Sequence, residues 1–362
     1  MNLLEEVRPG TNRYISGKGV LNQLPEYLEA FEKIAVVTGE VSFQVFKDYY
    51  NNELTYPVFI YDGSASDEDS GRLATEMGQV DVIVAIGGGR LLDTAKLTAE
   101  LIGSELMMIP TLISNCAPYA PAIAVYTHDD HQFKRFGIAL KSSFLTLVDW
   151  QFLLATPHDY LIAGIGDTLA KWYEIEGITR HLSEAEKTAP VRLGIAVAKE
   201  VLDILLADGQ KALDALDAQE VTSAFGRIAD TIIALSGGVG GFAGKYGRIA
   251  GAHAIHNGLS LLPETHEVLH GYKVAYGVLV QLSYTGDFAE IEKLLPLFKG
   301  LKLPTTLADI NVKALSREKL VRVADFAASE KESFSYIDPK ITTESVCLAI
   351  EKLEAFVSNK KW

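Results

Sequence analysis

The residues best suited to chemistry are histidines that gather in the last third of the chain. His253 and His256 lie three positions apart, so on a helix they would share one face, and His270 follows soon after. One carboxylate, Asp167, stands earlier in the chain where a helix is expected to begin. Imidazole nitrogens together with a carboxylate oxygen form a ligand set suited to zinc or ferrous iron. The residue types therefore allow a divalent metal site.

Each of these residues also has a purely structural interpretation. Asp167 could cap its helix, and His253 and His256 could be hydrogen-bonded histidines of a core. A fourth histidine of the group, His266, lies between Thr265 and Glu267 and has the setting of an exposed loop residue. Spacing alone leaves the metal site and these alternatives open.

A second candidate site is the glycine turn formed by Gly87, Gly88 and Gly89. The apolar run Val82–Ile86 leads into this turn, and a helix-like stretch follows it. Glycines let the backbone approach a phosphate closely, and a helix N-terminus offers free N–H groups and the positive end of a dipole. The turn could cradle a diphosphate, but a tight strand-to-helix turn without a ligand fits the same residues. It matches neither the GxGxxG nor the Walker A pattern.

The elements that must position these residues begin with alternating strands and helices. Helix-like stretches such as Asp67–Gly78 and Leu91–Leu101 separate β-rich runs, which is typical of a parallel sheet covered on both faces. The expected strands are Ile34–Thr38, Val58–Tyr61, Val82–Ile86, Met107–Ile109 and Leu145–Val148. A hairpin inserted before the last strand is expected at Ala122–Tyr126 and Phe133–Ala139, joined by the polar turn His128–His131.

After about residue 155 the β signals end and helical periodicity takes over. The expected helices include Val191–Ala207 with Gly209 as its stop, Phe225–Leu235, Val274–Tyr284 and Leu320–Ala328. We therefore predict the α/β class, with a Rossmann-like parallel-sheet domain over residues 1–156 and an all-helical domain over residues 157–362. The glycine cluster Gly237–Gly241 has an apolar, helix-like context, which favours close helix packing over a nucleotide site.

Composition excludes several classes of protein. The chain has 362 residues, 48% of them hydrophobic and 22% charged, which is a globular balance. Its net charge of −14 disfavours general binding to nucleic acid or anionic membranes. The two cysteines, Cys116 and Cys347, form no CxxC pair, which indicates free thiols in a reducing compartment. The acidic N-terminus has no signal-peptide pattern and no run nears the roughly 20 apolar residues of a membrane span, so we expect a cytoplasmic protein.

Taken together, the motifs resemble those of the iron-containing alcohol dehydrogenase and glycerol dehydrogenase family. The glycine turn continues with Asp93 and Lys96 in that family's pattern GGG-x-x-x-D-x-A-K, and Ile109–Ser114 matches its second nucleotide-contacting loop. The segments around Asp167, His253 and His270 resemble its metal-site segments in the same order. The resemblance is strong from Gly87 to about Gly277 and implies a fold like that of dehydroquinate synthase.

Position by position, the resemblance implies roles for individual residues. The implied ligands of one divalent ion, zinc or iron, are Asp167, His253 and His270, with His256 as a neighbour that orients the site or joins a proton path. The implied cofactor-binding residues are Gly39, Gly87, Gly88, Gly89, Arg90, Asp93, Thr111 and Ser114, and Tyr126 matches a tyrosine beside the family's substrate.

The chain departs from the glycerol dehydrogenase pattern at Cys116, where that family carries an aspartate that contacts the polyol. Removing this carboxylate removes both an acceptor for substrate hydroxyls and a repulsion of anionic substrates. The strings around Cys116, Asp167 and His270 look closer to a hydroxycarboxylate dehydrogenase subgroup that reduces 2-oxoacids. Three basic residues are candidate partners for a substrate carboxylate: Arg90, Lys141 and Lys171.

A second departure concerns the cofactor. Relatives that use NAD place an aspartate after the strand corresponding to Ile34–Thr38, where it accepts from the ribose hydroxyls. Here Gly39 takes that place, which relieves repulsion of a 2′-phosphate, although Glu40 could supply a carboxylate from the next position. We therefore favour NADP(H) over NAD(H).

The resemblance thus implies hydride transfer between NAD(P)H and a small 2-oxoacid or 2-hydroxyacid, with a metal polarising the substrate oxygen. Alternatives are a glycerol dehydrogenase, a dehydroquinate synthase-like lyase and a non-catalytic paralogue. The phosphate-anchoring basic residues of the lyase are not obvious here, and no metal ligand is lost as it would be in a paralogue. We expect a small-molecule substrate, no nucleic-acid or membrane partner, and a homo-oligomer.

Overall fold

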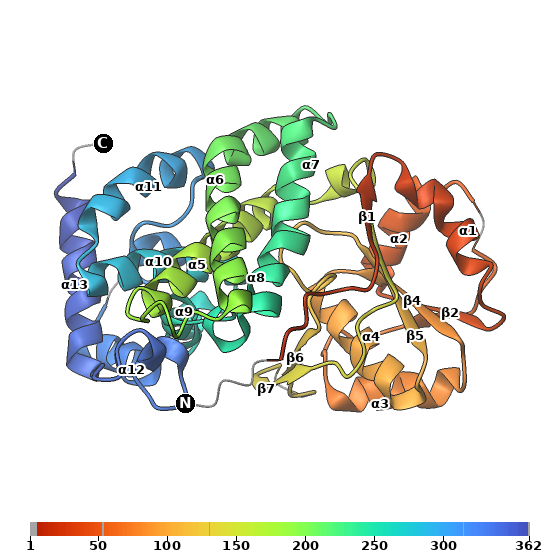
Figure 1. Ribbon diagram of the computed structural model, residues 1–362, viewed down its shortest axis with the longest axis horizontal. Helices are drawn as coiled ribbons and strands as arrows, with labels where there is room; N and C mark the ends of the chain where they lie inside the picture. Colours follow the sequence, from red (N-terminus) through yellow and green to blue (C-terminus); the bar gives the residue numbers. More distant parts are fainter. Residues whose placement is uncertain (1–5, 53, 130, 314, 361–362) are drawn as a thin grey trace. The chain divides into compact units, whose positions relative to one another are not determined.

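The computed structural model describes residues 6–52, 54–129, 131–313 and 315–360 (Figure 1). Residues 1–5 lie outside the described range, and with them most of the N-terminal segment in which the sequence shows no signal-peptide pattern. Asp130, in the turn of the expected hairpin, also lies outside it. The chain forms two compact units. One comprises Arg8–His158 with Asp214–Gly238, and the other comprises mainly Asp159–Leu213 with Val239–Trp362.

The first unit is built around a six-stranded sheet in which every strand pair is parallel. In spatial order its strands are β1 (Tyr14–Gly17), β8 (Leu145–Asp149), β5 (Glu105–Pro110), β4 (Val82–Gly87), β2 (Ile34–Thr38) and β3 (Val58–Ile60). The five strands expected from the sequence are all present, and β1 is an addition at one edge. This sheet confirms the predicted α/β class.

Both faces of the sheet are covered because successive strand residues point to opposite sides. On one face, Val36 and Val84 belong to a core shared with helices α1 (Leu24–Leu28) and α2 (Glu40–Tyr49). On the other, Val37, Ile83 and Ala85 pack against helices α3 (Asp67–Met77) and α4 (Gly89–Ile102). The near-continuous apolar runs of β2 and β4 are explained by this burial on two sides.

The chain order places the glycine turn at a switch in the sheet. From β2 the chain crosses to β3 at one edge, then returns to β4 on the other side of β2 and continues to β5. Residues at the carboxyl ends of β2, β4 and β5 therefore lie side by side, with Thr38 paired to Ile86 and Gly87 paired to Pro110. Open α/β sheets bind ligands in the crevice outside such a switch point.

The expected hairpin is also present, as a separate two-stranded antiparallel sheet of β6 (Ala122–Tyr126) and β7 (Phe133–Ile138). Its buried residues Ile123, Val125 and Ala139 form a small apolar cluster with Leu97 of α4. The hairpin is therefore anchored on the helix that follows the glycine turn.

The second unit is helical, and no strand follows β8 within the described residues. Its helices are α5 (His158–Thr179), α6 (Ala189–Asp217), α8 (Ser236–Ala243), α9 (Gly251–Leu259), α10 (His270–Thr285), α11 (Phe288–Leu301), α12 (Arg317–Ala327) and α13 (Thr343–Ser358). Three of them have residues in both units, since α5 and α8 begin in the first unit and α6 ends in it. The expected stop at Gly209 is wrong, because α6 continues through it to Asp217. A methyl group at Gly209 would make only an ordinary van der Waals contact with Leu297, at 3.6 Å, so this glycine lies inside the helix without a close approach that requires it.

The stretch Asp214–Gly238 belongs to the sheet-containing unit although it follows α5 and much of α6 in sequence. It carries α7 (Ser223–Asp230) and a π-helical turn at Thr231–Leu235. Asp230 accepts hydrogen bonds from Tyr14 at 2.7 Å and from Ser16 at 3.1 Å, which attaches this stretch to β1. The boundary expected between residues 156 and 157 remains a prediction.

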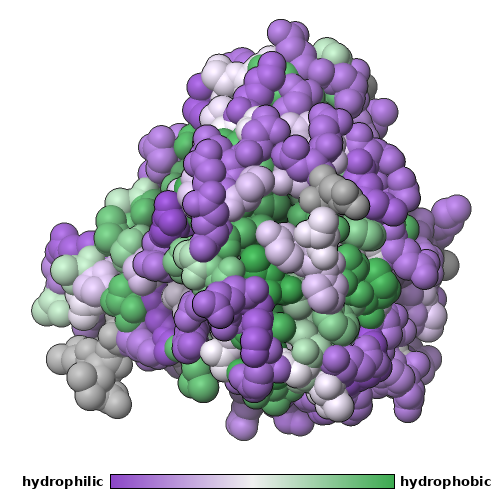
Figure 2. All heavy atoms as spheres, turned by 90° about the vertical axis from the view of Figure 1, so that its right-hand side faces the viewer, coloured by the Kyte–Doolittle hydropathy of each residue, from purple (hydrophilic) through white to green (hydrophobic). Residues whose placement is uncertain are grey.

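The surface of the sheet-containing unit carries both hydrophilic and hydrophobic residues. Figure 2 shows one face on which hydrophilic residues surround a group of hydrophobic ones. Val41 of α2 and Ile60 of the edge strand β3 are among the exposed hydrophobic residues of this unit. Within the described part of the chain, we find no helix with both the length and the apolar character needed to cross a bilayer.

Candidate metal centre and cofactor-binding turn

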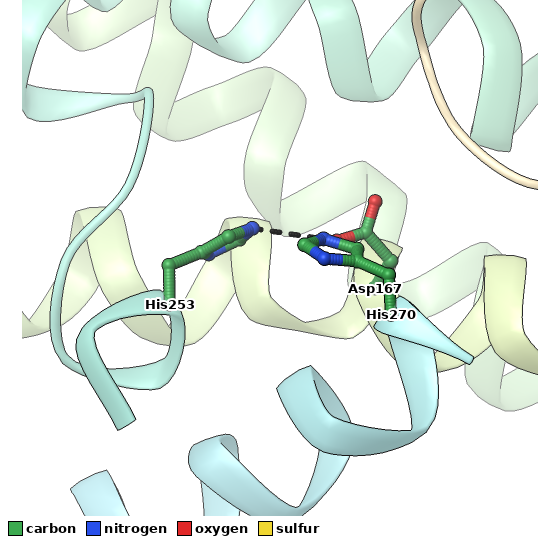
Figure 3. A group of neighbouring side chains, drawn as sticks. All are labelled: Asp167, His253 and His270. Carbon is green, nitrogen blue, oxygen red and sulfur yellow. Dashed lines mark hydrogen bonds and ion pairs between the residues drawn. The ribbon is translucent and has the colours of Figure 1, made fainter. Parts of the chain in front are cut away.

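The three expected metal ligands lie together in the helical unit (Figure 3). Asp167 comes from the middle of α5, His253 from the first turn of α9, and His270 is the first residue of α10. The Nε2 atoms of His253 and His270 lie 3.3 Å and 3.2 Å from the same oxygen, Oδ1 of Asp167. One ligand atom from each residue lies within 4.8 Å of the others.

Glycines beside the ligands let the helices approach closely enough to form this cluster. A methyl group at Gly271, next to His270, would lie 1.8 Å from the carbonyl oxygen of Ala163 on α5. A methyl group at Gly166, next to Asp167, would lie 2.7 Å from the carbonyl oxygen of Gly271. The backbones of α5 and α10 are therefore nearly in contact, and this contact sets the distance between Asp167 and His270.

A buried carboxylate that the sequence analysis did not assign, Glu174, orients His253. Its Oε2 lies 2.9 Å from Nδ1 of His253, and its Oε1 accepts from the backbone N–H groups of His253 at 3.0 Å and Ala250 at 2.7 Å. A carboxylate only accepts, so Nδ1 of His253 carries a proton, and Nε2 is the nitrogen that would give its lone pair to a metal bound in the cluster. Glu174 lies two helical turns after Asp167 on α5, and this spacing is the signal that could have identified it.

His270 is oriented by a second histidine. Its Nδ1 lies 2.9 Å from Nε2 of His256, so the near neighbour expected from the sequence does contact one of the candidate ligands. On the far side of its ring, Nδ1 of His256 lies 2.9 Å from Oδ1 of Asn257. His256 therefore bridges Asn257 and His270 without facing Asp167 itself.

The charges in this cluster are strongly coupled. Burial raises the pKa of Asp167, but hydrogen bonds with His253 and His270 outweigh it and hold that pKa well below its usual value. Burial lowers the pKa of His253, yet the charge of Glu174 and hydrogen bonds to both carboxylates bring it to about 9. For Glu174 too, burial raises the pKa and the nearby His253 and Lys171 lower it to a value below normal.

These features fit a divalent cation. The Nδ1 atoms of His253 and His270 face Glu174 and His256, and their Nε2 atoms converge with one oxygen of Asp167, so three atoms that can each offer a lone pair lie together. Such an arrangement is stable only if positive charge lies among them, as extra protons or as a metal ion. Two imidazole nitrogens and one carboxylate match zinc or iron sites that keep a coordination position for substrate.

The glycine turn lies in the sheet-containing unit, at the carboxyl end of β4. Gly88 is the residue before α4, which begins at Gly89, so free backbone N–H groups of the first helical turn lie at the switch in the sheet. The loop after β5 crosses over this turn: a methyl group at Gly88 would lie 3.0 Å from Leu112, and one at Gly89 would lie 2.8 Å from Asn115. Larger residues here would displace the side chains of Leu112 and Asn115.

The other expected cofactor residues surround the same sheet edge. Thr111 donates its backbone N–H to the carbonyl of Gly87 at 3.1 Å, and Ser114 is half-buried in the same loop. Gly39 follows β2 and precedes α2, and a methyl group there would lie 2.9 Å from the ring of Tyr61. Gly39, the glycine turn and Thr111 thus follow three neighbouring parallel strands.

The carboxylate of Asp93 already has protein partners. Its Oδ1 lies 2.8 Å from Nζ of Lys96, and its Oδ2 accepts from the backbone N–H of Ala124 at 3.0 Å. Lys96 also donates to the carbonyl of Ala122 at 2.7 Å. Burial raises the pKa of Asp93, against the lowering effect of Lys96. In this structure Asp93 joins α4 to strand β6.

We compared the chain with known proteins. The sequence profile of the family described as "Iron-containing alcohol dehydrogenase" matches residues 11–148. The chain is 38% identical over 300 residues to hydroxycarboxylate dehydrogenase A of Escherichia coli (strain K12), covering 82% of each chain. It is 34% identical to a glycerol dehydrogenase of Thermotoga maritima, covering 96% of this chain and 97% of the relative. The chain belongs to the iron-containing alcohol dehydrogenase family.

As a member of this family, the protein is an oxidoreductase that acts on CH–OH groups. Solved structures agree: the crystal structure of a probable glycerol dehydrogenase from Sinorhizobium meliloti 1021 superposes with a TM-score of 0.86 at 29% identity. That alignment covers 98% of this chain and 100% of the other. The predicted fold of a parallel-sheet domain followed by helices is thereby confirmed.

Family membership leaves open which basic residue meets the substrate, and the structure separates the three candidates. Lys141 lies 3.4 Å from Glu105, the first residue of β5, so it is at the end of the sheet opposite the glycine turn. Lys171 is buried and donates to the carbonyl of Arg248 at 2.9 Å. Arg90 is exposed in the first turn of α4, with its guanidinium carbon 4.9 Å from the ring centroid of Tyr126. Of these three candidates, Arg90 is the one that lies exposed at the glycine turn.

Proposed function

We propose that this enzyme is a metal-dependent, NAD(P)-linked dehydrogenase that interconverts small 2-oxoacids and 2-hydroxyacids. The observation that carries the proposal is the setting of Arg90 beside the glycine turn. Its guanidinium stacks on Tyr126, and among the described residues no carboxylate forms an ion pair with it. A planar, always-charged guanidinium is suited to a carboxylate.

Cys116 supports the same substrate class. It is half-buried in the loop that carries Asn115 over Gly89, and it stands where the resemblance places a polyol-contacting aspartate in glycerol dehydrogenases. A neutral thiol there neither repels a carboxylate nor accepts from a polyol hydroxyl as an aspartate would. The similarity to a relative named hydroxycarboxylate dehydrogenase A points in the same direction.

In this proposal each group of residues has a separate task. Gly88 and Gly89 let the cofactor diphosphate approach the start of α4, and Arg90 orients the substrate carboxylate. Asp167, His253 and His270 would hold one divalent ion, which when bound supplies Lewis-acid polarisation of the substrate oxygen. A nicotinamide cofactor held at the glycine turn would supply or accept the hydride of the substrate carbon.

We further propose that the enzyme accepts NADP(H) at least as well as NAD(H). Gly39 places no carboxylate after β2, where an acid would accept from the ribose hydroxyls and repel a 2′-phosphate. Glu40, the exposed first residue of α2, keeps NAD(H) possible. A homo-oligomeric state and a cytoplasmic location remain predictions.

The test is a substrate panel after controlled loading with zinc or iron. We would measure kcat/KM for 2-oxobutyrate, 2-oxoglutarate and glyceraldehyde with NADH and NADPH, and for glycerol with both oxidised cofactors. We expect the 2-oxoacids to be the best substrates and to require the metal. A wild-type enzyme that prefers glycerol to every oxoacid would instead support the second candidate, a glycerol dehydrogenase, which similarity to the Thermotoga maritima relative favours.

A further inference from the structure

A chain of three hydrogen-bonded contacts leads from the metal ligand His270 to a distant carboxylate, Glu332. Nδ1 of His270 lies 2.9 Å from Nε2 of His256, and Nδ1 of His256 lies 2.9 Å from Oδ1 of Asn257. The amide nitrogen of Asn257 then lies 3.2 Å and 3.0 Å from the two carboxylate oxygens of Glu332. Glu332 precedes the short helix Ser333–Tyr336, so it reaches this chain from a loop after α12.

The carboxylate of Glu332 determines the direction of every hydrogen bond in the series from Glu332 to His270. Since a carboxylate only accepts, the side chain of Asn257 must turn its NH₂ group to Glu332 and its oxygen to His256. That oxygen also only accepts, so Nδ1 of His256 must carry a proton. The remaining nitrogen of a neutral His256, Nε2, is then an acceptor, and Nδ1 of His270 must donate to it.

The result is that His270 keeps a proton on Nδ1, so Nε2 is the nitrogen whose lone pair is left for a metal. Nε2 is the atom that lies 3.2 Å from Asp167 in the metal cluster. If Asn257 were reversed, its oxygen would face the carboxylate of Glu332, and a charge-assisted hydrogen bond would become a repulsion. Hydrogen bonds in the reversed direction would leave a proton on Nε2 of His270, where it would block coordination of a metal.

A nearby hydroxyl does not disturb this direction. Ser260 lies 3.5 Å from Nε2 of His256, but its hydroxyl is 2.9 Å from the carbonyl oxygen of His256, to which it donates. Lys273 donates to the same hydroxyl oxygen at 2.9 Å. The nearest donor to Nε2 of His256 is therefore His270.

We propose that Glu332 is a positioning residue for the metal site: it fixes the amide of Asn257, and through it the tautomers of His256 and His270, so that His270 offers Nε2 to the metal. The inference rests on the metal site of the proposed function and adds residues outside the group of Asp167, His253 and His270. His256 then acts as a relay of orientation between Asn257 and His270. In other metal sites, partners that orient a ligating histidine typically affect affinity by 10- to 100-fold.

The test reverses the hydrogen bonds and measures zinc affinity by competition with a chromophoric chelator. Glu332→Lys places a donor where the acceptor was, so it favours the reversed amide and should weaken zinc binding by roughly tenfold or more. The glutamine of Glu332→Gln can donate or accept, so both orientations of the Asn257 amide become possible, and this freedom alone should lower zinc affinity only about twofold. The matched control is Glu330→Lys, which adds the same charge change two residues away at an exposed position.

A second background separates orientation from charge. The substitution Asn257→Ala removes the link between Glu332 and His256. In that background Glu332→Lys can act only through its charge, so it should weaken zinc binding much less than it does when Asn257 is present. An equal factor in both backgrounds would overturn the proposal. Melting temperatures of the metal-free variants check that each one folds.

The wild-type protein offers a test that requires no variant. In zinc-loaded protein, ¹⁵N chemical shifts should show the protons of both His256 and His270 on Nδ1. A proton on Nε2 of His256 would overturn the proposal while leaving the metal site intact. Absence of zinc binding by the wild type would overturn the metal site of the proposed function together with this inference.

Discussion

The carboxylate of Glu174 lies 2.9 Å from Nδ1 of His253, on the opposite side of the ring from the nitrogen that faces Asp167. Both carboxylates belong to α5, so a single helix orients this histidine and also supplies the acid that shares the cluster with it. Small residues beside the ligands bring α10 against the same helix. The metal affinity of the site should therefore depend on groups that do not themselves coordinate.

Glu174→Gln should weaken metal binding by roughly 10- to 100-fold, the usual effect of losing a carboxylate behind a ligating histidine. The change removes the negative charge that holds the proton on Nδ1 of His253. Zinc affinity is to be measured by chelator competition, with Glu176→Gln as the control because Glu176 pairs with Arg180 on the same helix. Equal affinities of the two variants would show that Glu174 has only a packing role.

His270→Ala should lose bound metal and with it the dehydrogenase activity, because one of three converging ligands is removed. His266→Ala is the matched control, since His266 is an exposed histidine four positions earlier. Metal content per chain, determined by elemental analysis after loading and desalting, distinguishes them. Stoichiometric metal with normal turnover in His270→Ala would contradict the ligand assignment.

Much of this arrangement could be predicted from the sequence because it depends on local patterns. Buried β-branched runs defined β2 and β4, and the polar turn between apolar alternations defined the hairpin of β6 and β7. Strand β1 was not predicted, since Tyr14–Gly17 is short and only half-buried. Gly209 was assigned as a helix stop because a glycine inside a helix and a glycine after one have the same local sequence signal.

The residues that contact the candidate metal ligands from outside the cluster were harder to predict. Glu174 shares a helix face with Asp167, but an acid two turns away also fits a solvated helix surface. Glu332 is 75 positions from Asn257 and sits in a loop, so no periodicity connects the two. Such contacts depend on how α9 and α12 pack, which a single sequence does not specify.

Asp93→Ala should destabilise the sheet-containing unit by about 3–5 kcal/mol, because it leaves a buried lysine without its counter-charge. Lys96 is 3% exposed and lies 2.8 Å from Asp93. The double variant Asp93→Leu/Lys96→Met should recover most of this loss, since an apolar pair needs no charge partner. Denaturant unfolding measures the free energy of unfolding of the single and the double variant. Unchanged stability together with lost cofactor binding would favour the cofactor role that the family resemblance implies for Asp93.

Gly39→Asp should shift the preference toward NAD(H), through a new acceptor for the ribose and repulsion of a 2′-phosphate. A hydrogen bond to a charged group contributes about 1.5–3 kcal/mol, which corresponds to roughly a 10- to 150-fold change in the ratio of kcat/KM values. Since a methyl group at position 39 would lie 2.9 Å from Tyr61, Gly39→Ala is the control for steric effects alone. A wild-type enzyme that strictly requires NAD(H) would show that Gly39 does not determine the preference.

Cys116→Asp should depress the reduction of 2-oxoacids and raise the oxidation of polyols. The new carboxylate would repel a substrate carboxylate more strongly in a partly desolvated site than in water, because the effective dielectric constant is lower there. It would also accept from a polyol hydroxyl, which is worth on the order of 1.5–3 kcal/mol.

Cys116→Asn separates charge from shape, since asparagine has nearly the size of aspartate and no charge. A methyl group at Gly237 would lie 3.3 Å from Cβ of Cys116, so either side chain meets the same steric limits. We expect kcat/KM for 2-oxobutyrate and 2-oxoglutarate to fall much further in the aspartate variant than in the asparagine variant. Equal losses in both would mean that the thiol acts through its size, and the electrostatic argument for a 2-oxoacid substrate would then rest on Arg90 alone.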